Sequence, residues 1–261
     1  MNLRRLFRIV ALAFGANGAL LYLVHSPVAQ AQRNPQVEAL LTSCAQAMGS
    51  RKAEAGFSGE GEIRYSNASP AEHFIWKAKG SEFSRQEFSG ADGVRVHVVN
   101  RGQGFHEKEG KRERLPFHQT AYFRHDYTPA LACEADAAHD GMRVEYIGRE
   151  VVEGQSVHHI RFSMAGQGKN RHADAVEELI SEYHVFIDSA TNRVAATRTW
   201  VFSPEAVENR SVWETIYSDY RDVNGVLVPF HIRNRVAGHD YRDITLTSAR
   251  SEPGLSERDF Q

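Results

Sequence analysis

Residues 213–232 read WETIYSDYRDVNGVLVPFHI, and they carry the strongest structural signal in the chain. Two runs rich in β-branched and aromatic residues flank Asn224-Gly225. This pair accepts positive φ at both central positions of a type I′ turn, the turn that suits the twist of paired strands. Glu153-Gly154 separates two further runs of the same kind. Repeated hairpin signals predict that the C-terminal half is an antiparallel meander.

The alternation of apolar and polar residues extends toward the N-terminus as far as Phe57. It stops between residues 115 and 135, where Pro and irregularly spaced aromatic residues predict one or two short helices. Another helix is expected over Pro35–Met48, with Asn34 as its N-cap and Gly49 after its end. With about eleven strands, the predicted fold class is α+β. It is a strongly curved, unclosed antiparallel half-barrel, with the N-terminal helix and the central insert as a lid.

The first residues have the features of an export signal. Arginines precede an apolar run from Ile9 to Val24, and Ala29-Gln-Ala31 has small residues at both positions that a cleavage site requires. The run is shorter than the ~20 residues of a membrane span, and an uncleaved membrane anchor is the alternative. We expect residues 1–31 to be a cleaved export signal and residues 32–261 to form one domain in the periplasm or cell envelope.

Composition argues against nucleic acid as a partner. The chain has 31 Lys and Arg against 33 Asp and Glu, a formal charge of −2. Removal of residues 1–31 takes away three arginines and no acids, which brings the charge from −2 to −5. A mildly acidic chain of mixed charge has no basic stripe for a phosphate backbone.

The sequence has no recognisable catalytic signature. It contains no G-x-S-x-G elbow, no Walker loop and no H-E-x-x-H motif. His158 and His159 are adjacent on a predicted strand, so they point to opposite faces and cannot hold one ion together. We therefore expect no enzymatic activity, no metal site and no cofactor.

Two cysteines, Cys44 and Cys133, are present in the whole chain. In an exported protein they are candidates for a structural disulfide that links the first helix to the central insert. Two buried free thiols are the alternative.

One expected face of the sheet is rich in large apolar side chains. A half-barrel too wide to be filled by its own side chains leaves an apolar groove suited to an acyl chain. A filled core is the alternative for the same residues. The residues expected to line the cavity are Phe74, Trp76, Phe162, Trp200, Phe202, Trp213, Val228, Phe230 and Ile232.

Several turn and strand segments resemble one superfamily. Ala47-Met-Gly49 followed by Phe57-Ser-Gly-Glu-Gly-Glu-Ile63 is similar to the start of periplasmic outer-membrane lipoprotein-carrier (LolA/LolB-like) domains. Tyr146-Ile-Gly148, Val185-Phe-Ile-Asp188 and Tyr217-Ser-Asp-Tyr220 resemble their later strands and turns. The resemblance implies an unclosed half-barrel with helices over a hydrophobic cavity that holds lipoprotein acyl chains. The carriers' functional arginine has no matching motif in this sequence.

These observations lead to one expected function and one alternative. The expected protein is an exported, non-enzymatic carrier or sensor that binds a lipid or lipoprotein acyl chain in an apolar cavity. Envelope membrane proteins are further candidate partners. The alternative is a structural or protein-interaction module of the envelope, with a filled core and no ligand.

Export should remove the signal segment at Ala31. We expect the intact mass of the exported protein to correspond to a chain that begins at Gln32, because signal peptidase cuts after the second small residue. A mass that still includes Arg4 and Arg5 would instead indicate the membrane-tethered form.

Overall fold

The computed structural model describes residues 34–67, 69–116, 120, 128–133, 141–165, 168, 170–202 and 209–261. The expected export signal lies outside these residues. The strands are β1 (Phe57–Tyr65), β2 (Glu72–Lys79), β3 (Phe83–Gly90), β4 (Gly93–Asn100), β5 (Gln103–Lys108), β6 (Lys111–Leu115), β7 (Met142–Val152), β8 (Gln155–Met164), β9 (Tyr183–Asp188), β10 (Val194–Phe202), β11 (Arg210–Val223), β12 (Val226–Val236) and β13 (His239–Ser251). The helices are α1 (Pro35–Met48), α2 (Ser50–Ala53), α4 (Arg171–Ser181) and the 3₁₀ helices η2 (Pro129–Leu131) and η4 (Glu257–Phe260).

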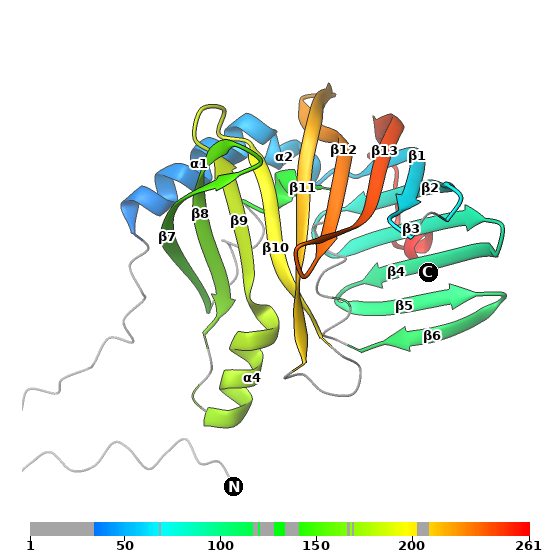
Figure 1. The fold of residues 1–261 in the computed structure, drawn as a ribbon, viewed down its shortest axis with the longest axis horizontal. Coiled ribbons are helices and arrows are strands. Elements are labelled where there is room, and N and C mark those ends of the chain that lie inside the picture. Colours follow the sequence, from blue (N-terminus) through cyan, green and yellow to red (C-terminus); the bar gives the residue numbers. More distant parts are fainter. Residues whose placement is uncertain are drawn as a thin grey trace, which may run out of the picture. The chain divides into compact units, whose positions relative to one another are not determined.

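These strands form one antiparallel sheet in the order β6-β5-β4-β3-β2-β1-β13-β12-β11-β10-β9-β8-β7 (Figure 1). Strands β6 and β7 are the two edges, so the sheet is not closed within the described residues. Strands consecutive in sequence pair with each other, except β6 and β7, and β1 also pairs with β13. The predicted meander and the unclosed antiparallel architecture are therefore confirmed. The count of thirteen strands exceeds the expected count of about eleven.

The hairpin turns follow from the residues that the sequence places there. Asn224 and Gly225 have φ of 57° and 83°, and Val223 pairs with Val226 across them. Glu153 and Gly154 have φ of 49° and 80° at the turn between β7 and β8. Positive φ at both central positions is the geometry of a type I′ turn, as predicted.

Helix α1 begins and ends as expected. The Asn34 side chain accepts a hydrogen bond from the Gln36 backbone N–H, and Gly49 ends the helix in the left-handed conformation. One stripe of the helix is buried against the sheet, and Figure 1 shows α1 and α2 along one end of the strands around β8 to β11. The stripe consists of Val37, Leu41, Cys44 and Met48.

The central insert is described only in part. Its helix η2 and the following Ala132 and Cys133 are buried, and they belong to the same apolar cluster as the stripe of α1. Most of the rest of the predicted insert, residues 117–119, 121–127 and 134–140, lies outside the described residues. Helix α4 was not expected from the sequence. It begins after Asn170, whose side chain accepts hydrogen bonds from the backbone N–H groups of His172 and Ala173.

Cys44 and Cys133 form a disulfide, as one of the two alternatives predicted. Their Cα atoms are 6.3 Å apart, within the range that a disulfide spans. The bridge ties α1 to the end of η2, and Ser50 of α2 donates a hydrogen bond to the carbonyl of Ala130 beside it. Closing a loop of this length is worth ~4 kcal/mol on the chain-entropy model.

No helix among the described residues is both long enough and apolar enough to cross a membrane. The C-terminal helix η4 packs on the strands at the other end of the sheet. Phe260 and Leu255 form a small cluster there with Val96 and Val98 of β4.

Replacement of Gly49 by alanine should destabilise the protein far more than replacement of Gly238. Both glycines have positive φ, 73° and 81°, so each alanine meets backbone strain of ~1–2 kcal/mol. A Cβ at Gly49 would also lie 2.0 Å from the carbonyl oxygen of Gly225, whereas a Cβ at Gly238 meets nothing within 4 Å. We expect Gly49→Ala to cost ~1–3 kcal/mol more than Gly238→Ala in urea unfolding. Equal costs would mean that the α1 terminus does not pack on the β11–β12 turn.

Candidate functional site

The two faces of the sheet are distinguished by what packs on them. Ile63, Ile232 and Ile244 pair across β1, β12 and β13 and therefore share one face. This face carries the main apolar cluster, in which the stripe of α1 and helix η2 also lie. We call it the inner face and the opposite side the outer face.

Six of the nine residues expected to line the cavity belong to this main cluster. Each is at most 6% exposed, so the structure brings them together in a continuous apolar layer against α1 and η2. They are Phe74, Trp76, Phe162, Val228, Phe230 and Ile232. Trp213, Trp200 and Phe202 lie outside that cluster.

Trp200 lies on the outer face because of a β-bulge in β10. Val194 pairs with Ile187 and belongs to the inner cluster, but Ala196 pairs with Phe186, which belongs to a separate outer cluster. Ala195 is therefore an extra residue, and it reverses the alternation for the rest of the strand. Trp200 and, by the same alternation, Phe202 are on the outer face, where strict alternation from Val194 would have placed them inside.

Trp213 is on the inner face but in polar surroundings. Its indole N–H donates to the Thr215 hydroxyl at 3.1 Å, and the Asn234 amide donates to the same oxygen at 2.8 Å. Arg242 donates to the Asn234 carbonyl oxygen at 2.6 Å, and its guanidinium lies 5.0 Å from the Trp213 ring. We call these four residues the inner polar chain. All of them are buried, so the chain is a satisfied polar network within the sheet.

A second polar group continues the inner face across β1, β2 and β4. Arg95 forms an ion pair with Glu72 and donates to the Tyr65 hydroxyl at 3.3 Å. Burial raises the pKa of Tyr65 above its usual range, although the nearby Arg242 and Arg95 act in the opposite direction. The Tyr65 phenol is therefore neutral and can donate as well as accept.

His97 of β4 faces the same region. Burial, together with the neighbouring His106, Arg242 and Arg95, lowers the pKa of His97 to about 3. Its ring lies 5.0 Å from the His106 ring and 5.3 Å from the Phe88 ring. A neutral imidazole at this position adds hydrogen-bonding capacity to the inner face without adding charge.

The apolar and polar regions of the inner face lie toward different strand ends. The Asn224-Gly225 turn touches Lys52 and Gly49, so this end of β11 is covered by α1 and α2. Trp213 lies ten residues back from Val223, ~33 Å along an extended strand. The inner face is thus amphipathic: apolar beside the helices and polar toward the other end of β11 to β13.

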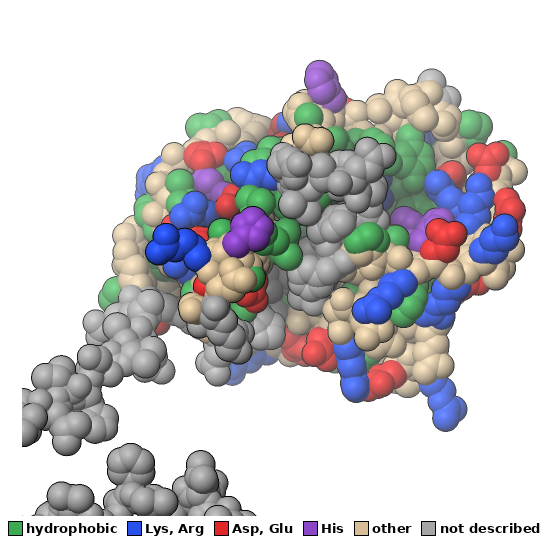
Figure 2. Space-filling model, turned by 90° about the horizontal axis from the view of Figure 1, so that it is seen from below, with side chains coloured by type: hydrophobic (Ala, Val, Ile, Leu, Met, Phe, Trp, Pro, Cys, Tyr) green, Lys and Arg blue, Asp and Glu red, His purple; other side chains and the backbone are tan. Residues whose placement is uncertain are grey.

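Two open cavities lie elsewhere, at the β4–β5–β6 end of the sheet. Their volumes are about 320 and 350 Å³, and none of the nine expected residues lines them. Phe105, with Arg112 stacked over it at 4.2 Å, lines the larger one. Figure 2 shows charged side chains of both signs interspersed over the described part of one side of the molecule. Among the described residues no three His, Cys, Asp or Glu side chains are grouped to hold a metal ion.

The class of fold is now defined: an unclosed, wholly antiparallel sheet with a disulfide-tethered helix on its inner face. No family model and no curated protein matches the sequence. Solved structures match over most of the chain. A LolA superfamily protein from Nitrosomonas europaea has a TM-score of 0.55 at 10% identity, covering 86% of this chain and 97% of its own.

Two further structures match to the same extent. A putative outer membrane lipoprotein-sorting protein domain from Vibrio parahaemolyticus has a TM-score of 0.56 at 11% identity. A DUF1329 family protein from Desulfovibrio piger has a TM-score of 0.55 at 14% identity. Each match covers 86% of this chain and 97% of the other. The chain therefore has a LolA-like fold, which confirms the resemblance at the level of fold.

The inner polar chain should be more sensitive to the loss of one hydroxyl than a nearby position on the same face. Thr215 accepts two buried hydrogen bonds, whereas Thr197 exchanges one, at 3.1 Å, with the Tyr217 hydroxyl. We expect Thr215→Val to cost ~2–4 kcal/mol and Thr197→Val ~1 kcal/mol, because each buried donor that loses its acceptor costs ~1–3 kcal/mol. Urea unfolding of both variants measures the difference. If Thr215→Val lowers the free energy of unfolding less than Thr197→Val does, the two hydrogen bonds assigned to Thr215 do not stabilise the protein as proposed.

Proposed function

We propose that this protein is an exported, non-enzymatic carrier or sensor of the cell envelope that binds a lipid or lipoprotein acyl chain. The observation that carries the proposal is the joining of six expected lining residues and the buried stripe of α1 in one apolar cluster. A helix that covers an apolar sheet face along a single stripe is suited to act as a lid. The LolA-like fold and its similarity to a domain described as lipoprotein-sorting support the same function.

Binding would require α1 to separate from the sheet at one end. Cys44 and Gly49 hold its C-terminal half, through the disulfide and the close contact with Gly225. In the N-terminal half, Val37 and Leu41 are buried in the apolar cluster. We therefore propose that an acyl chain enters beneath Val37 and Leu41 while the disulfide keeps the helix attached. Each buried methylene contributes ~0.8 kcal/mol, so a chain of ordinary length can replace the helix contacts that it displaces.

We further propose that residues 1–31 are a cleaved export signal and that residues 32–261 are one half-barrel domain in the periplasm. The disulfide supports this location, since such bridges persist in oxidising compartments.

A structural or protein-interaction module is the second candidate. It is favoured by the low exposure of the six lining residues, which is the burial expected of a filled core. Native mass spectrometry of delipidated protein mixed with envelope lipid extract separates the two candidates. Uptake of lipid by the protein supports the carrier, and its failure to take up any lipid supports the module.

A bulky residue on the inner face should separate folding from binding. We expect Val228→Trp to leave the thermal midpoint nearly unchanged and to abolish lipid uptake, because a wall that can open accommodates the ring where the acyl chain would lie. Phe230→Ala should cost less than the ~3–5 kcal/mol of a filled core. Val94→Trp is the control, since Val94 is 52% exposed on β4 and the change should affect neither measurement.

The opposite result identifies the module. If Val228→Trp lowers the free energy of unfolding by the ~1–3 kcal/mol of an overpacked core, and wild type takes up no lipid, the carrier proposal is wrong.

A further inference from the structure

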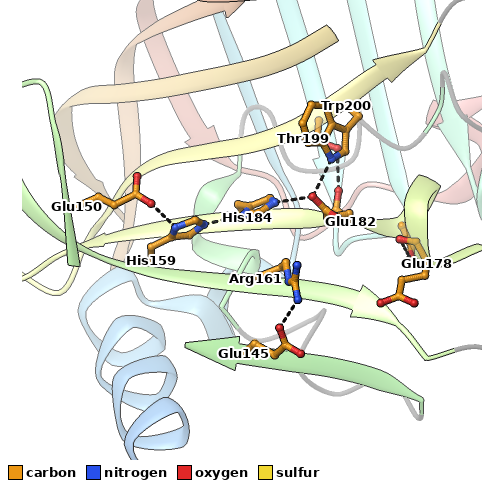
Figure 3. A network of polar contacts seen from close by, with 10 residues as sticks. Glu145, Glu150, His159, Arg161, Glu178, Glu182, His184, Thr199 and Trp200 are labelled. Carbon is orange, nitrogen blue, oxygen red and sulfur yellow. Dashed lines mark hydrogen bonds and ion pairs between the residues drawn. The ribbon is translucent and has the colours of Figure 1, made fainter. Parts of the chain in front are cut away.

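A chain of four titratable side chains crosses the outer face from β7 to the start of β9 (Figure 3). Glu150 Oε1 lies 2.5 Å from His159 Nδ1, His159 Nε2 lies 2.6 Å from His184 Nδ1, and His184 Nε2 lies 2.9 Å from Glu182 Oε1. The two histidine side chains are only 6% and 12% exposed. Glu182 also accepts a hydrogen bond from the Trp200 indole N–H at 2.9 Å, so the chain reaches β10.

The number of protons in this chain follows from its end groups. A carboxylate only accepts hydrogen bonds, so the ring nitrogens facing Glu150 and Glu182 must each carry a proton. The hydrogen bond between His159 Nε2 and His184 Nδ1 needs a third proton. Two neutral imidazoles carry two protons in total. The complete chain therefore holds one proton more than two neutral rings, shared across one pair of nitrogens.

The surrounding charges limit the pair to that one extra proton. Arg161 on β8 is paired with Glu145, and Arg198 on β10 is paired with Glu214 of β11. Both arginines disfavour positive charge on His184. Two imidazolium rings with nitrogens 2.6 Å apart would repel each other in a site that is shielded from water.

Burial acts in opposite directions on the pKa of the two histidines and on the pKa of Glu182. Burial holds the pKa of His159 and of His184 below its ordinary value, partly offset by the hydrogen bonds to Glu150 and Glu182. For Glu182, burial alone would raise the pKa. The hydrogen bonds from His184 and Trp200 outweigh it, with support from Arg210, and the net pKa of Glu182 is lowered. Glu182 therefore remains a carboxylate that accepts.

We propose that His159 and His184 form one proton-binding site on the outer face, which takes up a single proton in weakly acidic solution and thereby completes the chain from β7 to β10. In the neutral pair one of the three contacts faces acceptor to acceptor and has to lengthen. Proton uptake therefore lets all three contacts between β7, β8 and the start of β9 form at once. The inner side of β7 carries Met142, Val144 and Tyr146, which pack on the cluster that holds α1.

A metal ion fits the pair less well than a proton. Ring nitrogens bind zinc at ~2.0–2.1 Å, so two ligands on one ion need ~3.3 Å between them in tetrahedral geometry. The observed 2.6 Å is the distance of a hydrogen bond.

The test is a titration of the histidine ring nitrogens by ¹⁵N NMR in the mature protein, from about pH 8 to about pH 5. We expect the two rings to change together with one midpoint below 6.5, and their combined change to equal one proton. Separate midpoints, uptake of two protons, or no change over this range would overturn the proposal. Abolition of the step by one equivalent of Zn²⁺ would overturn it in favour of a metal site.

Two variants and a control locate the proton in the chain. Glu150→Gln and Glu182→Gln should each lower the shared midpoint by about one pH unit or more, because each removes a carboxylate that stabilises the cation. Glu178→Gln should leave it in place, since Glu178 pairs with Arg143 outside the chain. Equal midpoints in all three variants would contradict the proposal.

Stability gives an independent readout of the same site. The folded pair binds its proton more weakly than unfolded histidines do. The free energy of unfolding should thus fall as the pH is lowered through about 6.5. The fall should become less steep, without stopping, once the folded pair has taken up its one proton, because two unfolded histidines bind two. The fall should be smaller in the double variant His159→Gln, His184→Gln. An unchanged fall in that variant would count against a shared site.

Discussion

The attachment of α1 at its C-terminal end is the constraint on which the inner face depends. The bridge from Cys44 to Cys133 joins the helix to η2, and Gly49 approaches the β11–β12 turn more closely than any side chain would permit. A thirteen-stranded sheet with an uncovered apolar face would expose more apolar surface than a soluble domain tolerates. One short helix can cover that face only if its position on the sheet is fixed. The disulfide and the close approach of Gly49 to Gly225 fix that position.

On the outer face of β8 to β11, polar side chains of the sheet itself cover apolar ones. A small apolar cluster that includes Val157 and Phe186 is buried there. Polar side chains lie flat on it: the His159 ring stacks on Phe186 at 4.4 Å, and the Arg198 guanidinium lies 4.6 Å from the same ring. Arg198 in turn pairs with Glu214. The His159 ring and the Arg198 side chain thus shield Phe186 from water.

Local chemistry made part of this fold predictable. The Asn224-Gly225 turn, the Asn34 cap and the end of α1 at Gly49 each depend on residues adjacent in sequence, and all were predicted. Strand β6 was not predicted, because Lys111–Leu115 is an edge strand with four charged residues and no alternation of apolar and polar residues. The face of Trp200 could not be predicted, since the bulge at Ala195 is set by pairing with β9 and leaves no mark in the sequence of β10.

The polar parts of the structure were unpredictable for a related reason. The inner polar chain joins residues on β11, β12 and β13 that meet only when all three registers are known. The histidine chain joins β7, β8 and the start of β9 in the same way. Both networks connect neighbouring strands by side chains, in addition to the backbone ladder. Side chains therefore cross-link the sheet on its outer face from β7 to β10 and on its inner face from β11 to β13. Movement of α1 away from the inner face would not require the strands beneath it to separate.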